Sequence, residues 1–187
     1  MPETGDDLEA DPEVRAAHAE QGKAAWQGTL EDMEAMADAR EDEGWDVVTV
    51  TALSGAPKSS EKDDRGRHGL VFVVPDNQAE DLEAAIDAGE FPRFDVYRVE
   101  QTGEVFLVIE YLDPETETAV LVAGTYELRY AAAMVEEARA KGHTVTVIHP
   151  GLFKTWPCPT YPEIRLALFA GRRFIRWLRR QQLEEQV

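Results

Sequence analysis

Few side chains in this 187-residue sequence have the types and spacing that metal binding or catalysis requires. The four histidines, His18, His68, His143 and His149, include no pair at i, i+4 spacing, and the single cysteine, Cys158, has no base that can be assigned to it. A zinc site or an activated thiolate needs such neighbours. We therefore predict no metal site, no cofactor and no catalytic residue.

The dipeptide Gly124-Thr125 has a setting suited to anion binding, because it lies between an apolar strand-like run and a helical pattern. Backbone N–H groups at a helix N-terminus face an anion there, and Glu127, Arg129 and Tyr130 would lie nearby. The rest of a phosphate loop or dinucleotide fingerprint is absent, so a glycine turn followed by a threonine N-cap explains the pair as well. Gly124 and Thr125 remain a candidate anion site of an enzyme or nucleotide-responsive domain.

Acidic residues in the middle of the chain invite comparison with nucleases. The order helix, three strands, helix, strand occurs in restriction-endonuclease-like folds, which hold metal with an acid on the second strand and Glu/Asp-x-Lys on the third. Glu104, Glu110 or Asp113 would supply the first acid, but the third strand reads ETAVLVA and has no lysine. Because many folds share this element order, we do not predict nuclease activity.

The stretch 94–150 supplies the elements that organise the chain. Alternation places Val105, Leu107, Ile109 and Tyr111 on one face of a strand that is also apolar on its other face, which is typical of an interior strand. Turns at 102–103 and 113–114 make this strand the middle of an antiparallel meander. We expect its third strand at 119–123, a helix from Thr125 to Gly142, and a further strand at 143–148.

The remaining elements extend that sheet. We predict a helix at 23–43, with Trp26, Leu30, Met33 and Ala37 on its inner face, and strands at 45–53 and 69–74 separated by a polar loop at 54–67. A short helix begins near Asn77 and ends at Gly89. The expected fold is α/β (α+β), with a mixed sheet of about six strands and helices on its faces.

Composition suggests the setting of the protein. The formal charge is −18, and 14 arginines accompany only 5 lysines, a balance that resembles proteins of salt-rich cytoplasm. One cysteine fits a reducing compartment, and no signal peptide or membrane-spanning run is present in the sequence, so we expect a halophilic, cytoplasmic protein. We expect residues 1–22 to be an acidic disordered segment and residues 23–150 to form the domain.

The C-terminal part, residues 151–187, has the opposite charge. A proline-rich connector precedes a predicted amphipathic helix at 161–180, which has six arginines and one glutamate. The arginines fall within an arc of about 120°. The candidate partner-binding residues are Arg165, Phe169, Arg172, Arg173, Arg176, Trp177, Arg179 and Arg180.

The strand cores resemble a haloarchaeal family of unknown function over about residues 26–148. The resemblance rests on GWDVVTV, GLVFVVP, VFLVIEYLDPETETAVLVAGTYE and the alanine-rich run that follows. It implies a salt-rich source, but it identifies no activity or site residue, and it excludes the arginine-rich segment.

We interpret the chain as a non-enzymatic interaction module whose arginine-rich helix docks on its own domain or on a protein partner, including a second copy. Two alternatives stay open. One is the enzyme or nucleotide-responsive domain with its anion site at Gly124-Thr125. The other is peripheral binding of an anionic membrane or nucleic acid through the arginine-rich helix, which high salt would weaken.

Overall fold

The structure is a computed structural model that describes residues 12–62, 68–150 and 164–169. Within these ranges a long helix, α1 (Pro12–Asp42), is followed by strands, two further helices and two short 3-10 turns. The order continues with β1 (Asp46–Thr51), β2 (Ser54–Lys58), η1 (Ser60–Lys62), β3 (Gly69–Val74), α2 (Asp76–Ala88), β4 (Arg93–Gln101), β5 (Glu104–Asp113), β6 (Thr118–Glu127), η2 (Leu128–Tyr130), α3 (Ala132–Lys141), β7 (His143–Pro150) and β8 (Ile164–Phe169).

The strands form two four-stranded sheets, where the sequence predicted one sheet of about six strands. The first has the order β1-β6-β5-β4 and the second has the order β2-β3-β7-β8. Each contains one parallel pair, β1 with β6 and β3 with β7, and its other pairs are antiparallel. The antiparallel meander β4-β5-β6 confirms the prediction for the centre of the chain.

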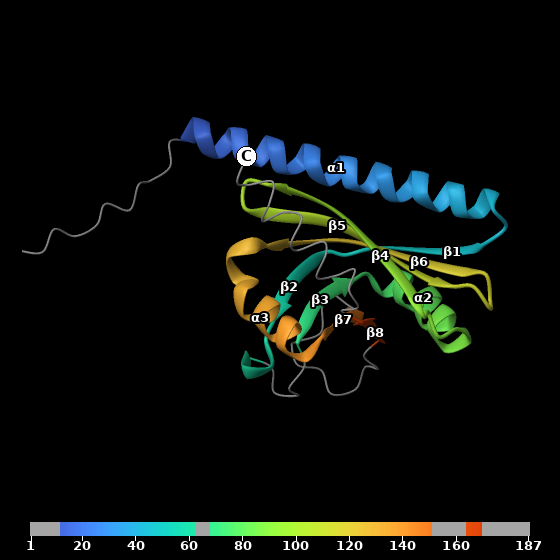
Figure 1. Cartoon of the computed structure of the whole chain (residues 1–187). Helices are drawn as coiled ribbons and strands as arrows, with labels where there is room; N and C mark the ends of the chain where they lie inside the picture. The colour runs from blue at the N-terminus through green and yellow to red at the C-terminus, as the bar shows by residue number, and fades with distance from the viewer. Residues whose placement is uncertain (1–11, 63–67, 151–163, 170–187) are drawn as a thin grey trace, which may run out of the picture.

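Three layers result. Helix α1 lies along one face of the first sheet, the second sheet lies on the other face, and α2 and α3 lie on the side away from α1 (Figure 1). Helix α2 connects a strand of the second sheet to a strand of the first, so it is not a crossover within one sheet.

Strand β5 contributes to two cores, as its apolar faces predicted. Val105, Leu107, Ile109 and Tyr111 pack between the sheets with side chains such as Phe72. On the opposite face, Val108 and Leu112 pack under Met33 of α1. The Tyr111 hydroxyl also bonds Thr146 Oγ1 of β7 at 2.7 Å, and burial of the phenol raises its pKa. The tyrosine therefore ties the two sheets together through a satisfied polar contact.

Four boundaries differ from the predictions. Helix α1 begins at Pro12 rather than at residue 23, since alanines favour a helix where acidic composition suggested disorder. The predicted loop 54–67 contains β2 and η1. Strand β6 runs on to Glu127, and α3 begins only at Ala132. Finally, residues 164–169 form β8, paired with β7, where we predicted helix.

Candidate functional site

Helix α1 presents a carboxylate face to the surroundings. All eight acidic residues of this helix are exposed. Seven of them fall within an arc of about 100° on the side opposite Met33, calculated at 100° per residue. They are Glu13, Glu20, Glu31, Glu34, Asp38, Glu41 and Asp42. We call these seven residues the α1 carboxylate face.

The inner side of α1 follows the prediction for this helix. Met33 and Ala37 are buried, and Trp26 and Leu30 pack against the same cluster. Every residue from Pro12 to Glu20 is exposed, because this end of the helix reaches past the strands (Figure 1). Because the apolar side of α1 packs on the sheet, the carboxylates on its opposite side face the solvent.

Arg40 does not neutralise the carboxylate face, because it points toward the sheet. Its Nε lies 2.8 Å from Oε1 of Glu110, and its second terminal nitrogen lies 3.3 Å from Oε2. Glu110 is only 2% exposed, in the middle of β5. Arg40 also contacts Glu43 at 2.9 Å and lies 5.6 Å from the centre of the Trp45 ring. Hydrogen bonding to Glu110 outweighs burial and raises the pKa of Arg40.

The carboxylates of α1 repel one another. Glu34, Asp38, Glu41 and Asp42 have no ion pair within the part of the chain that the structure describes. Asp38 lies four residues from Glu34, three from Glu41 and four from Asp42, and like charges at these spacings cost about 0.2–0.5 kcal/mol per pair. A cation bound along this face would remove that repulsion, so the face suits a positively charged partner.

A pocket lies on the other side of the molecule, where β2 and β6 part. Gly55 of β2 packs so closely on β6 that an added Cβ would stand 2.2 Å from the Thr125 carbonyl oxygen. A pocket of about 350 Å³ lies beside this contact. It is lined by Gly55, Ala56, Pro57, Lys58, Ser59, Glu127, Tyr130 and Ala133.

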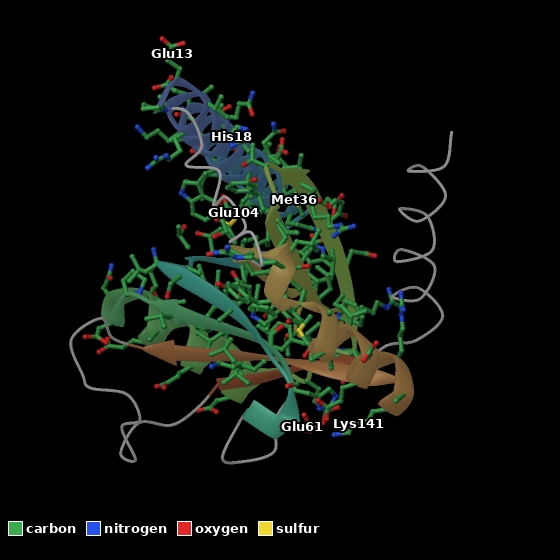
Figure 2. The ribbon with its side chains drawn as sticks, turned by 90° about the vertical axis from the view of Figure 1, so that its left-hand side faces the viewer. Glu13, His18, Met36, Glu61, Glu104 and Lys141 are labelled. Atoms are coloured by element: carbon green, nitrogen blue, oxygen red, sulfur yellow. The ribbon has the colours of Figure 1, made fainter. Side chains whose placement is uncertain are left out.

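A carboxylate from α3 holds the chain segment beside this pocket. Glu137 accepts hydrogen bonds from the Ser60 N–H at 2.7 Å, from the Ser60 hydroxyl, and from Lys141 Nζ at 2.6 Å. Burial acts to raise the pKa of Glu137, but the bonds from Lys141 and Ser60 and the charge of Lys141 outweigh it and lower the pKa to about 2. Glu61 and Lys141 lie at the opposite end of the molecule from Glu13 and His18 (Figure 2).

Gly124 and Thr125 do not lie at a helix N-terminus, so the predicted basis for an anion site there is wrong. Both belong to β6 and stand opposite Leu107 and Phe106 of β5. Gly124 lies against the Phe72 ring, which an added Cβ would approach to 2.3 Å. The glycine permits close packing of the two sheets and makes no turn. Of the residues expected near this site, Glu127 and Tyr130 do line the pocket.

The proposed nuclease acids do not converge. Glu110 is bound by Arg40, and Asp113 accepts hydrogen bonds from the N–H groups of Glu90 and Glu115, each at 2.9 Å. These bonds lower the pKa of Asp113, and the bond from the Glu90 N–H has the largest effect. Within the described ranges, no group of three metal-ligating side chains occurs. Glu110 and Asp113 therefore have structural partners in this fold.

The remaining predicted residues divide between described and undescribed parts. His18 lies on the exposed end of α1, and His68 is buried, with its carbonyl accepting a bond from Thr144. Among the candidate partner-binding residues, Arg165 and Phe169 belong to β8 and not to a helix. Arg172, Arg173, Arg176, Trp177, Arg179, Arg180 and Cys158 lie outside the described residues. No described helix is long and apolar enough to cross a membrane.

Sequence reasoning missed the pocket because it assigned residues 54–67 to a loop. Four of its lining residues lie in β2, which is difficult to recognise as a strand because Gly55 and Pro57 are residue types that are uncommon within strands. The available signal was the pair of strand glycines, Gly55 and Gly124, each marking a close approach between backbones or sheets.

Comparison with known proteins gives one match. The model of the family of unknown function DUF7529 matches residues 12–151. No curated protein and no solved structure matches the chain. The match begins with the first residue of α1 and ends one residue beyond β7, so it includes the carboxylate face and the pocket.

Proposed function

We propose a function from the residues of this chain itself, because the chain belongs to a family of unknown function, DUF7529. The protein is a non-enzymatic interaction module in which the arginine-rich segment 170–180 binds an α1 carboxylate face. The face belongs either to the same molecule or to a second copy. The single observation behind the proposal is the row of exposed carboxylates on α1, of which Glu34, Asp38, Glu41 and Asp42 have no ion pair among the described residues.

Charge complementarity supports this pairing. Segment 170–180 contains five arginines and no acidic residue. If it is helical, the five guanidinium groups share an arc of about 120°, which is similar in width to the carboxylate arc of α1. Each exposed ion pair contributes only about 0.2–1 kcal/mol. Several pairs together with relief of the repulsion along α1 would nevertheless produce a measurable association.

The position of β8 limits how the segment approaches. Strand β8 ends at Phe169, opposite His143, at the edge of the second sheet. The first sheet lies between that edge strand and α1, and stacked layers are about 10 Å apart. Arg172 follows Phe169 by three residues, which span about 10 Å even when extended, so within the same molecule only the arginines near residue 180 would reach α1. The α1 helix of a second copy requires no such crossing and is open to all five arginines.

A salt-rich, reducing cytoplasm is the setting that we propose for this module. The α1 carboxylate face and the formal charge of −18 support it, because concentrated salt screens repulsion between exposed charges. An archaeal, halophilic origin accounts for the same composition.

The test uses three variants and the full chain. One variant ends at Phe169 and so retains β8. The second replaces Arg172, Arg173, Arg176, Arg179 and Arg180 with glutamine, and its matched control replaces the same five residues with lysine. Molar mass by light scattering and the thermal unfolding midpoint are measured in 0.1 M KCl.

A cis contact predicts that truncation and the glutamine variant lower the midpoint while the protein remains monomeric. A contact in trans predicts that both convert a dimer to a monomer, and in either case the lysine variant retains most of the effect. An unchanged midpoint and mass in the glutamine variant would overturn the proposal. Loss of sedimentation with anionic vesicles or with duplex DNA in that variant would then favour the alternative surface.

A further inference from the structure

The pocket beside β2 is lined by a lysine, although the chain as a whole is strongly acidic. Lys58 is half-buried and has no ion pair with any described residue. Arg129 lies beside the pocket and pairs with Glu127 at 2.5 Å. The lining contains one lysine and one glutamate, and Arg129 pairs with that glutamate, so Lys58 is left as the positive charge of the lining.

An aromatic platform stands at the same place. Tyr130 lines the pocket, yet it is 60% exposed, the largest exposure among the large hydrophobic side chains that the structure describes. The Arg129 guanidinium lies 4.7 Å from the centre of its ring. The ion pair with Glu127 and the contact with the Tyr130 ring both restrain Arg129, so the tyrosine and the arginine together present a flat surface.

The opposite wall is held in place. Ser59 is buried, and the following residue is bound to Glu137 of α3 through both its N–H and its hydroxyl. Glu137 is in turn bound to Lys141, so its charge is compensated within the wall. The segment 58–60 is therefore bound to α3 through Glu137, which favours a preformed site.

We propose that this pocket binds a small ligand composed of a planar ring and an anionic group, with the ring on Tyr130 and the anion near Lys58 and Ser59. Its volume of about 350 Å³ admits one ring system with one charged substituent. A nucleoside monophosphate and an aromatic carboxylate share this chemistry. This inference does not rest on the proposed pairing of α1 with the arginine-rich segment.

The experiment measures binding to the full chain by isothermal titration calorimetry at 0.1 M KCl. The probes are AMP, adenosine, benzoate and inorganic phosphate. Lys58→Gln removes the cation, and Lys23→Gln, an exposed lysine on α1, is its control. Tyr130→Ala removes the platform, and Tyr97→Ala, a 48% exposed tyrosine on β4, is its control.

We expect AMP or benzoate to bind more tightly than adenosine and phosphate, which each lack one of the two groups. Lys58→Gln and Tyr130→Ala should each weaken that binding about tenfold or more, since stacking and charge-assisted contacts are lost. Preference for AMP identifies a phosphate ligand, and preference for benzoate identifies a carboxylate ligand.

Three results would overturn the proposal. The first is the absence of millimolar or tighter binding for both AMP and benzoate. The second is equal affinity for adenosine and AMP in a chain that does not bind benzoate. The third is binding that the control substitutions weaken as much as those in the pocket. Circular dichroism of each variant confirms that it is folded.

Discussion

Arg40 connects the long helix to the sheet beneath it, and its partner is a carboxylate with almost no access to water. Glu110 is 2% exposed, whereas the side chain of Arg40 is 26% exposed and has a second partner in Glu43. The two members of the pair are therefore unequal. A buried charge that loses its partner is destabilising, whereas a partly exposed charge can find water or another partner.

We predict that Arg40→Met destabilises the protein by about 3–5 kcal/mol, because it leaves the Glu110 carboxylate buried without a partner. Glu110→Gln should cost only about 1–2 kcal/mol, because the amide retains the shape and Arg40 retains Glu43. Urea denaturation at pH 7 measures the free energies of unfolding of both variants, and Arg139→Met, at an exposed position of α3, is the control. A larger cost for Glu110→Gln would contradict this order.

A second carboxylate, Glu137, makes the contact between α3 and the Ser60 turn dependent on pH. Its pKa is lowered from 4.5 to about 2 in the folded protein. A lowered folded-state pKa means that the ionised group adds stability above pH 4.5, and that this contribution is lost as the pH falls toward 2.

We therefore predict that the unaltered protein loses more stability between pH 5 and pH 3 than Glu137→Gln does, by about 1–2 kcal/mol after allowance for screening. Urea denaturation at the two pH values measures the difference. Glu136→Gln, at the neighbouring exposed position, should keep the pH dependence of the unaltered protein. Identical pH dependence in all three proteins would show that the Glu137 contacts do not stabilise the fold.

At the scale of elements, the two sheets meet most closely where glycines stand. An added Cβ at Gly55 would lie 2.2 Å from a backbone oxygen and 2.6 Å from the Phe72 ring. Gly28, in the middle of α1, has no atom within 4 Å of an added Cβ. The same substitution should thus act in opposite directions at the two positions.

We predict that Gly55→Ala costs about 2–3 kcal/mol, because the backbone of β6 has to move. Gly28→Ala should add about 0.5–1 kcal/mol, because alanine loses less conformational entropy in a helix. Thermal unfolding of both variants at one pH provides the comparison. Stabilisation by Gly55→Ala would mean that β2 and β6 do not pack as described.

Elements with a clear helical or strand pattern of apolar residues could be predicted from the sequence. The run 69–74 is β3, the helix expected from Asn77 to Gly89 is α2 at Asp76–Ala88, and both apolar faces of β5 are buried. A repeat of 3.6 residues identifies the buried side of the helix, and a continuous apolar run identifies a strand that is covered on both faces.

The division into two sheets could not be predicted, because alternation identifies a buried face and not the element that covers it. Thr125 illustrates a local error of the same origin. A threonine after glycine suits an N-cap, but pairing with β5 keeps it in a strand, and the helix begins at Ala132. Residues 164–169 show apolar spacing compatible with a helix, yet pairing with β7 makes them a strand.

For the candidate sites, the sequence indicated residue types but not their neighbours. Glu127 and Tyr130 were expected near an anion site, and they do line one pocket. Lys58 and Ser59 were assigned to a loop and were missed. Their proximity to η2 depends on the contact between β2 and β6, which joins segments about 70 residues apart and leaves no local pattern.

The whole molecule separates its charges. Exposed carboxylates cover the outer side of α1, and the arginines concentrate in the segment after β8. Attraction between them depends strongly on salt, because the screening length falls from about 10 Å at 0.1 M to about 3 Å at 1 M. In the salt-rich setting proposed for this module the contact would therefore be weak, and it would strengthen when the salt is diluted.

A double-mutant cycle between the two surfaces is the most direct test. One variant carries Glu34→Gln, Asp38→Asn and Glu41→Gln, the other carries the five Arg→Gln substitutions of segment 170–180, and a third combines them. Free energies of unfolding are measured at one protein concentration in 0.1 M and 2 M KCl. We predict a coupling of about 1–3 kcal/mol at low salt that falls by more than half at high salt. Additive effects at 0.1 M KCl would contradict the pairing.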